Sequence, residues 1–191
     1  MGGDGFIDNA LIENNIVYGN SKKGLSLISI RYGRIQNNII YNNGSSAGGI
    51  HIVEESGRNF SIGNVVVNNT IDEPNIACVR VNAENTDNVI FNNICIGSTG
   101  IVFEGSGNYQ SDNYASTTGT GIFVNRTSRD YHLVQNSPAI GYGVSSYLSN
   151  LAPPVDFNNN ARTSSFDAGA YEYVTGVPVA APATPNGLSV Q

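Results

Sequence analysis

Asparagine-centred segments recur along the chain at a nearly constant spacing. In four of them an Asn precedes a short run of Ile, Val or Cys, and we align these Asn residues at positions 15, 38, 64 and 93. The steps between them are therefore 23, 26 and 29 residues. A period of this size, with β-branched runs bounded by Asn and Gly, indicates a solenoid in which each repeat stacks on the next.

A second ladder of strand-like runs alternates with the Asn segments. Gly or Cys opens each run, and its first apolar residue lies at position 25, 50, 79, 101 or 122. Apolar and variable residues alternate within these runs with period 2, as they do in β-strands. Each repeat thus offers three short strands, which predicts an all-β parallel β-helix. A β-sandwich is disfavoured, because it would show turn signals about every 8–12 residues.

Stacking explains the repeated residues without any function. Equivalent residues of neighbouring coils lie about 4.8 Å apart, so stacked Asn side chains can hydrogen-bond along a column. Asn also tolerates the left-handed backbone of a tight corner. Tyr18 and Tyr41 occupy equivalent places in successive repeats, and we expect their rings to stack.

Composition narrows the choice of partners. The chain has 191 residues, enough for one domain with a continuous core. Its net charge of −6 argues against a nucleic-acid partner, because phosphates are bound by clusters of Lys and Arg. No apolar run reaches the length of about 18 residues that a spanning helix needs, so we expect no membrane insertion. Repeat-like sequence follows Met1 directly without a signal peptide, as expected of an N-terminally truncated fragment.

Two cysteines, Cys78 and Cys95, lie within less than one repeat of each other. Neither has a second Cys or a His at zinc-finger spacing. We interpret them as two small buried hydrophobic residues. A single disulfide within one coil is the alternative.

The pattern of repeats changes after about residue 126. We therefore divide the chain into parallel β-helix coils over 1–126, a last coil with an irregular C-terminal cap over 127–173, and a linker over 174–191 that is rich in Pro, Ala, Val and Thr. A β-helix has two open ends that can pair with other chains, and a non-repeating segment is expected to close one of them. The open N-terminal end is then available for self-association.

Two stretches carry a resemblance to a known family. One is the repeat Asn-Asn-Ile-Ile-Tyr-Asn-Asn, and the other is a closing segment in which Ser-Pro-Ala-Ile at 137–140 is followed by Asp-Ala-Gly-Ala-Tyr-Glu at 167–172. They resemble the right-handed parallel β-helix proteins of the pectate-lyase-like superfamily, and the closing segment is similar to that of exported bacterial members. The resemblance implies right-handed coils and a secreted or cell-surface protein that acts on or binds polysaccharide. The tail also resembles the start of a fibronectin type III module.

The resemblance also implies where a site would lie. In this superfamily the substrate groove is on the outer face of the sheet that corresponds here to the Gly-led ladder. Alternation gives that face two outward columns, the first formed by Ser26, His51, Arg80, Val102 and Phe123 and the second by Ile28, Val53, Asn82, Glu104 and Asn125. From these we predict catalytic roles for His51, Arg80 and Glu104, and substrate contacts for Ser26, Asn82, Phe123 and Asn125.

Two classes of function remain open, a catalytic module and a non-catalytic one. In a polysaccharide lyase His51 would abstract a proton and Arg80 would stabilise the resulting charge, whereas in a glycoside hydrolase Glu104 would act with a second carboxylate. The alternative is a non-catalytic carbohydrate-binding, adhesion or structural module. No metal site or cofactor is expected, although a lyase would bring Ca²⁺ into consideration.

Overall fold

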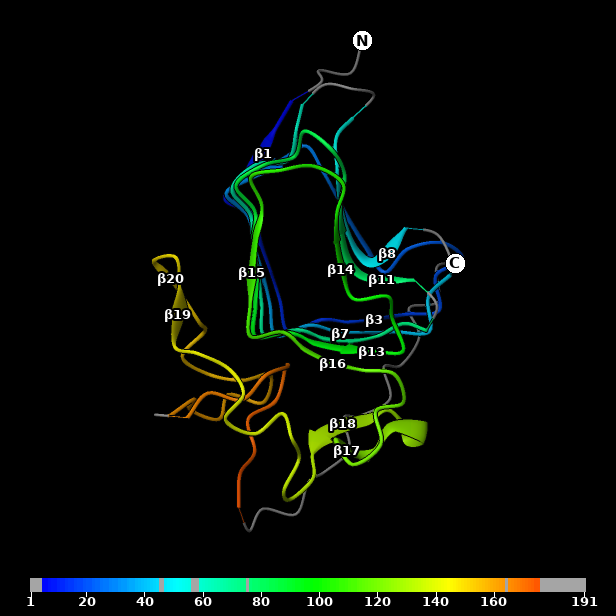
Figure 1. Ribbon diagram of the computed structural model, residues 1–191, viewed down its shortest axis with the longest axis vertical. Coiled ribbons are helices and arrows are strands. Elements are labelled where there is room, and N and C mark those ends of the chain that lie inside the picture. The colour runs from blue at the N-terminus through cyan, green and yellow to red at the C-terminus, as the bar shows by residue number, and fades with distance from the viewer. Residues whose placement is uncertain (1–4, 45–46, 56–58, 75, 164, 176–191) are drawn as a thin grey trace, which may run out of the picture.

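The computed structural model describes residues 5–44, 47–55, 59–74, 76–163 and 165–175. Over these residues the chain consists of short strands and turns, with one 3-10 helix, η1 (Arg126–Ser128). The strands stack in parallel into a β-solenoid of about four turns, consistent with the right-handed form, which confirms the predicted parallel β-helix. Figure 1 looks nearly along the solenoid, so that successive coils overlie one another.

Four coils contribute one strand to each of three parallel sheets, and the last coil contributes to sheets II and III alone. Sheet I contains β4 (Leu25–Ile28), β8 (Gly48–Val53), β11 (Ala77–Val81) and β14 (Ile101–Phe103). Sheet II contains β2 (Leu11–Glu13), β6 (Arg34–Gln36), β9 (Val65–Val67), β12 (Val89–Phe91) and β15 (Tyr109–Ser111). Sheet III contains β3 (Ile16–Tyr18), β7 (Ile39–Tyr41), β10 (Thr70–Asp72), β13 (Ile94–Ile96) and β16 (Tyr114–Ser116). Two shorter strands, β1 (Ile7–Asp8) and β5 (Ile30–Arg31), also pair in parallel.

The core runs through the inside of the coils. Alternate residues of each strand point inward, so the middle residues of sheets II and III stack on their counterparts above and below. Ile35, Val66 and Ile90 are in register in sheet II and are fully buried. Since the same column holds β-branched side chains in successive coils, the repeat in the sequence becomes a continuous apolar core.

The two Asn residues at each corner between sheets II and III have different functions. The first of each pair has a left-handed backbone, with φ of 55° at Asn14, 52° at Asn37, 53° at Asn68 and 56° at Asn92. The second forms an internal ladder in which the backbone N–H and side-chain amide of one residue donate to the side-chain oxygen of the next. This ladder runs through Asn15, Asn38, Asn69, Asn93 and Asn113.

The repeat alignment was wrong in the third coil. Asn64 was taken as the corner residue, but that corner contains Asn68 and Asn69. Asn64 belongs to a separate ladder at the start of sheet II, where it donates to Asn88 Oδ1 across 2.9 Å. Both corners carry Asn followed by apolar residues, so the sequence alone did not separate them.

Residues 123–173, which we call the C-terminal strap, leave the solenoid pattern. The strap begins with β17 (Phe123–Asn125), which pairs antiparallel with β18 (Asp130–Leu133) after η1. A second hairpin joins β19 (Ser146–Tyr147) to β20 (Asn150–Leu151). In Figure 1 the strap lies beside sheets II and III, outside the outline of the coils.

The expected C-terminal cap is therefore not placed over the end of the solenoid. Apolar strap residues such as Tyr131, Leu133 and Tyr171 pack on the outer face of sheet III. The outward-facing Asn68 donates to the Asp167 and Gly169 carbonyls, and Asn92 donates to the Val144 carbonyl. The left-handed Asn residues of three successive corners, Asn37, Asn68 and Asn92, thus anchor the strap. Parallel stacking already ends at β16, before the expected boundary at residue 126, and the linker at 174–191 lies outside the described residues from position 176 onward.

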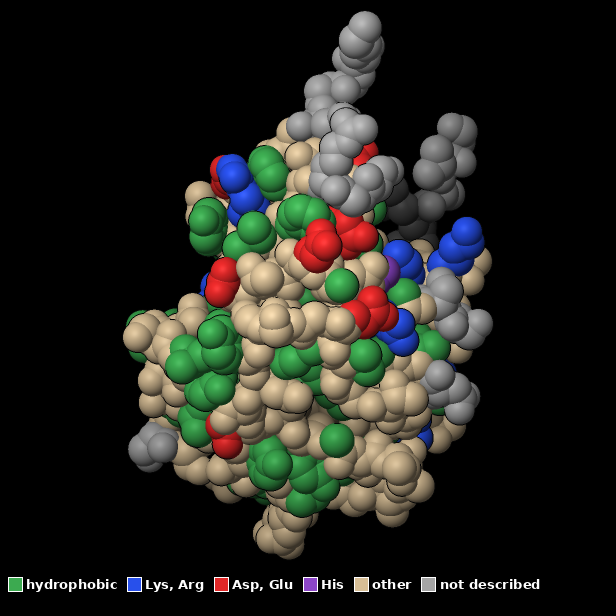
Figure 2. All heavy atoms as spheres, turned by 45° about the horizontal axis from the view of Figure 1, so that its top comes forward, with side chains coloured by type: hydrophobic (Ala, Val, Ile, Leu, Met, Phe, Trp, Pro, Cys, Tyr) green, Lys and Arg blue, Asp and Glu red, His purple; other side chains and the backbone are tan. Residues whose placement is uncertain are grey.

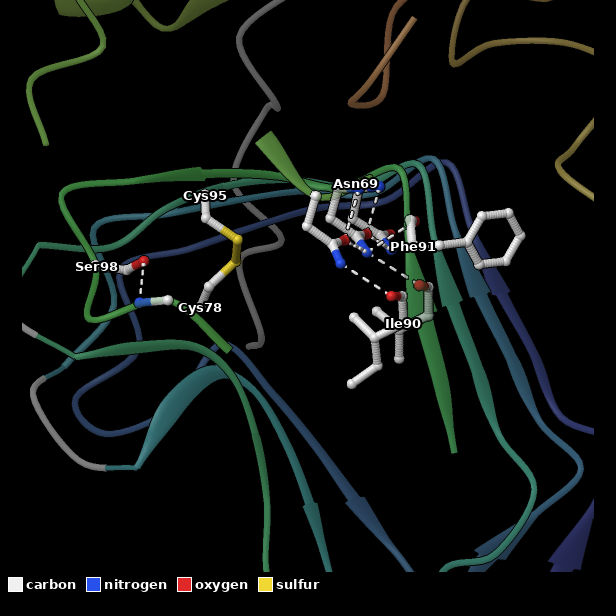
Figure 3. Close-up of a disulfide and its surroundings, with 10 residues drawn as sticks. Asn69, Cys78, Ile90, Phe91, Cys95 and Ser98 are labelled. Atoms are coloured by element: carbon white, nitrogen blue, oxygen red, sulfur yellow. Dashed lines mark hydrogen bonds between the residues drawn. A yellow bond between two sulfur atoms is a disulfide. The ribbon is translucent and has the colours of Figure 1, made fainter. Parts of the chain in front are cut away.

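The expectation of unpaired cysteines was wrong, because Cys78 and Cys95 form a disulfide. Figure 3 shows the bond crossing from the start of β11 to β13 inside the coil, next to the Asn ladder. In earlier coils Gly24 and Gly49 occupy the place of Cys78, and a Cβ there would approach Ile40 Cγ2 and Ile71 Cγ2 to 2.5 Å. Ile40 and Ile71 stack in register with Cys95. In the third coil the Gly–Ile pair is thus replaced by a Cys–Cys pair.

Candidate functional site

On the outer face of sheet I, the first four residues of the first predicted column lie as the alternation predicts. Ser26 lies opposite His51, His51 opposite Arg80, and Arg80 opposite Val102 in neighbouring parallel strands. The second column also stays in step, since Ile28 pairs with Val53 and the backbone N–H of Asn82 donates to the Ile52 carbonyl. The column of polar side chains therefore follows the axis of the solenoid along one face.

The surroundings of His51 favour its neutral form. Its side chain is largely buried, and Nε2 lies 2.8 Å from Asn82 Oδ1. A carbonyl oxygen only accepts hydrogen bonds, so Nε2 carries the proton and Nδ1 has a lone pair. That Nδ1 is buried and has no hydrogen-bond partner within the described part of the chain. Burial lowers the pKa of His51, the hydrogen bond to Asn82 opposes this, and the nearby charges of Lys23 and Arg80 lower the pKa further.

Arg80 joins the two columns. Its Nη1 donates to Glu104 Oε1 across 2.6 Å, and its Nε donates to the Ala47 carbonyl across 3.1 Å. About a third of each side chain remains exposed, 35% for Arg80 and 37% for Glu104. The pair therefore presents one cation and one carboxylate to solvent side by side, with their charges matched.

Two of the expected substrate-binding residues lie elsewhere. Phe123 was placed in the first column, but β17 pairs antiparallel with β18 and the Phe123 ring packs against Tyr131 in the strap core. Asn125 was placed in the second column, but its Oδ1 accepts a hydrogen bond from the Ser128 N–H and caps η1. The Gly-Ile-Phe-Val run resembles the Gly-led strands in sequence, yet it forms the first strand of a hairpin.

Within the described residues, the carboxylates of Glu104 and Glu54 are both bound to other side chains. Glu54 lies at the end of β8 and accepts a hydrogen bond from the Asn85 side-chain amide across 3.0 Å. Glu104 itself is bound to Arg80. No group of three or more His, Cys, Asp or Glu side chains that could hold a metal ion occurs among the residues that the structure describes.

Lys23 is a charged neighbour of this site that the sequence analysis did not single out. Its charge acts on the His51 imidazole, and its side chain is only partly exposed. The signal available in the sequence was its place directly before Gly24, where the outer face of sheet I begins. Lys23, Arg80 and Glu104 together give the site charges of both signs. Figure 2 likewise shows acidic and basic side chains gathered together in the upper part of one face, above a lower part that is mostly apolar or uncharged.

The charged and aromatic groups of the closing segment make structural contacts. His132 stacks on Tyr171 with ring centroids 3.8 Å apart, and its Nδ1 lies 2.6 Å from Asp130 Oδ1. Asp167 and Glu172 accept hydrogen bonds within the strap. Tyr18 and Tyr41 stack as expected, with centroids 5.2 Å apart and ring planes 9° from parallel.

Comparison with models of known protein families found no match to this chain, and neither did comparison with curated proteins. Within the described residues, no helix is long and apolar enough to cross a membrane.

Proposed function

We propose that the outer face of sheet I binds a polysaccharide chain without cleaving it, as a module of a secreted or cell-surface protein. The observation that carries this proposal is that the three candidate catalytic residues are already bound to other groups. Arg80 is paired with Glu104, and the one unprotonated nitrogen of His51 is buried. A general base has to reach the proton that it abstracts, and here no such lone pair faces outward from the His51 ring.

The chemistry of the face favours a neutral polysaccharide. Ser26, Asn82 and the Arg80–Glu104 pair offer hydroxyl, amide, guanidinium and carboxylate groups, all of which can hydrogen-bond sugar hydroxyls. The lowered pKa of His51 favours its neutral form, and the charge of Arg80 is matched by that of Glu104. Lys23 leaves this face with one more cation than carboxylate, which is less positive charge than a polyanion with a charge on every sugar would need.

The polar column runs along the solenoid axis over several coils, which suits an extended ligand. Neighbouring coils repeat about every 4.8 Å, so one sugar ring would span roughly one coil. The disulfide supports the proposed location outside the cytoplasm, because disulfides persist mainly in oxidising compartments.

The experiment compares binding and cleavage with one set of proteins. The wild-type chain, Arg80→Ala and Arg31→Ala would be run on affinity gels that contain neutral or uronic-acid polysaccharides. Arg31 is the matched control, because it forms an ion pair of similar exposure with Asp8 on a different part of the coil. We expect retardation by a neutral polysaccharide, a loss of affinity of about tenfold to a hundredfold in Arg80→Ala, and no change in Arg31→Ala. This range corresponds to about 1.5–3 kcal/mol for hydrogen bonds to a charged group.

Two results would contradict the proposal. One is equal retardation of all three proteins or of none. The other is the appearance of unsaturated products or new reducing ends, which would instead support the lyase or hydrolase alternatives, with Arg80 and His51 or Glu104 as their active groups.

A further inference from the structure

The second outward column of sheet I changes its chemistry along the solenoid. In neighbouring strands it consists of two aliphatic side chains, an amide and a carboxylate, namely Ile28, Val53, Asn82 and Glu104. Ile28 is 46% exposed and Val53 is partly exposed. Both side chains point away from the solenoid, so an adjacent coil flanks them without covering their outer side. An aliphatic pair is therefore open to a ligand on the same face as the polar groups.

The amide of Asn82 lies next to this pair in a fixed orientation. Its Oδ1 accepts a hydrogen bond from His51 Nε2 across 2.8 Å, which determines the direction in which the amide nitrogen points. That nitrogen, Nδ2, carries two N–H groups, and neither donates to any of the described residues. Asn82 is partly exposed, so its Nδ2 is available to an acceptor on a ligand.

Val53 and Asn82 are direct neighbours across two paired strands. The Asn82 backbone N–H donates to the Ile52 carbonyl, which brings Asn82 into register with Val53 at a strand spacing of about 4.8 Å. An aliphatic contact and a hydrogen-bond donor therefore lie side by side. The group that matches them has a methyl and a carbonyl oxygen on the same carbon, so that both contacts can form at once.

From these observations we infer that this part of the face binds an acetyl group carried by the polysaccharide. The inference rests on the proposed function and specifies its ligand more closely. The acetyl methyl would lie on Ile28 and Val53, and the acetyl oxygen would accept a hydrogen bond from Asn82 Nδ2. An acetyl group is uncharged, in keeping with the paired charges of Arg80 and Glu104 on this face. A free hydroxyl in its place would leave the aliphatic pair in water, so the acetylated chain binds more tightly.

Acetyl groups occur on polysaccharides as amides of amino sugars and as esters of hydroxyl groups. Both forms present a methyl and a carbonyl oxygen, and two pairs of ligands distinguish them. N-acetylchitopentaose and cellopentaose share one backbone and linkage, and they differ in an acetamido group or a hydroxyl on each sugar. Acetylated glucomannan and the same polymer after deacetylation differ in the ester alone.

Calorimetric titration of the full chain with both pairs measures the preference. We expect the acetylated member of at least one pair to bind about tenfold more tightly, the size expected of one buried methyl and one neutral hydrogen bond together. The pair that shows the preference identifies the amide or the ester as the source.

A double variant, Ile28→Thr with Val53→Thr, tests the aliphatic pair. Thr keeps the β-branched shape that suits a strand and replaces apolar groups by hydroxyls. The affinity for the acetylated ligand should fall to that of its unacetylated partner, whose own affinity stays unchanged. Val102→Thr is the matched control, because Val102 points outward from the same sheet two strands away from Val53. It should leave the preference as it is in the wild-type chain.

Asn82→Asp tests the hydrogen bond, since Asp keeps an acceptor for His51 and has no N–H donor. This variant should also lose the preference for the acetylated ligand. In the wild-type complex, NMR should show a nuclear Overhauser effect between the acetyl methyl and the Val53 methyls.

Two results would overturn this inference alone. One is equal affinity for both members of both pairs, and the other is a preference that survives in the double Thr variant. The proposed function would remain in place in either case, because the polysaccharide would still bind. Failure of all four ligands to bind would overturn the proposed function and this inference together.

Discussion

Arg162 and Glu172 form a buried ion pair, in which Arg162 Nη1 donates to Glu172 Oε2 across 2.9 Å. The Arg162 side chain is completely buried, and its Nη2 donates to the Gly169 carbonyl and to Asn37 Oδ1 of the solenoid, whereas its Nε has no partner among the described residues. One guanidinium thus connects two parts of the strap with each other and with a corner of the second coil. Burial lowers the pKa of Arg162 and raises that of Glu172, so the mutual attraction of the pair is opposed by the loss of hydration.

Arg162→Ala should destabilise the fold by about 3–5 kcal/mol, because the variant leaves the Glu172 carboxyl buried without its partner. Urea unfolding measures the change. Arg31→Ala is the control, since its partner Asp8 is exposed and such pairs contribute about 0–1 kcal/mol. If both variants lost the same small amount, the strap would not depend on Arg162.

Asn69→Ala should cost at least about 3 kcal/mol, whereas Asn15→Ala should cost less than about 1 kcal/mol. Asn69 is fully buried and both accepts from Asn38 and donates to Asn93 and the Ile35 carbonyl, so its removal leaves several buried groups without partners. Asn15 is the exposed first member of the same ladder and only donates. Urea unfolding curves of the two variants would reveal the difference, and equal losses would show that the ladder does not stabilise the interior.

Replacement of the disulfide should separate what the covalent cross-link contributes to stability from what side-chain packing contributes. Cys78→Ala with Cys95→Ala is expected to lose about 3 kcal/mol, the usual contribution of a cross-link over a loop of this size. Cys78→Gly with Cys95→Ile restores the Gly–Ile pair of the earlier coils and should recover part of that loss through packing. Thermal unfolding with and without reductant is the measurement. A Gly–Ile variant less stable than the Ala pair would contradict the equivalence of the coils.

The His51 imidazole should titrate below its ordinary pKa of about 6.5. Glu104→Gln should lower the pKa further, because it removes a favourable carboxylate, and Arg80→Gln should raise it, because it removes a repelling cation. NMR titration of the two His side chains of the chain measures both shifts. Shifts in the opposite directions would mean that Arg80 and Glu104 do not face the His51 ring.

The lowered pKa of His51 also predicts how the stability of the fold depends on pH. The folded state holds His51 neutral more strongly than the unfolded chain does, so the contribution of this residue is fully present above about pH 6.5 and is lost as the pH falls. His51→Gln should therefore weaken the decline of stability on acidification. Unfolding free energies compared between neutral and mildly acidic solution provide the check.

Much of the fold could be predicted from the sequence because each coil repeats the same physical requirement. Inward β-branched residues and the Asn corner recur in most coils, and their period is visible without any knowledge of the partner strands. The register of Ser26, His51 and Arg80 followed from alternation alone. The position of Glu104 beside Arg80 followed from the same register.

The remaining features depend on information that short segments lack. The run at 121–124 has the composition of a coil strand, but the direction of its partner, β18, is set by the hairpin that follows. The disulfide becomes visible only when Cys78 is aligned with Gly24 and Gly49, and Cys95 with Ile40 and Ile71. The place of the strap depends on outward Asn side chains that look identical in sequence to those of the internal ladder.

The most direct test of the proposed function is calorimetric titration of the wild-type chain with the neutral polysaccharide that retards it most, with product formation assayed in the same sample. The account predicts heat of binding, a loss of affinity of about tenfold or more in Arg80→Ala, and an unchanged polysaccharide at the end of the titration. Depolymerisation of the ligand, or binding that survives in Arg80→Ala, would contradict it.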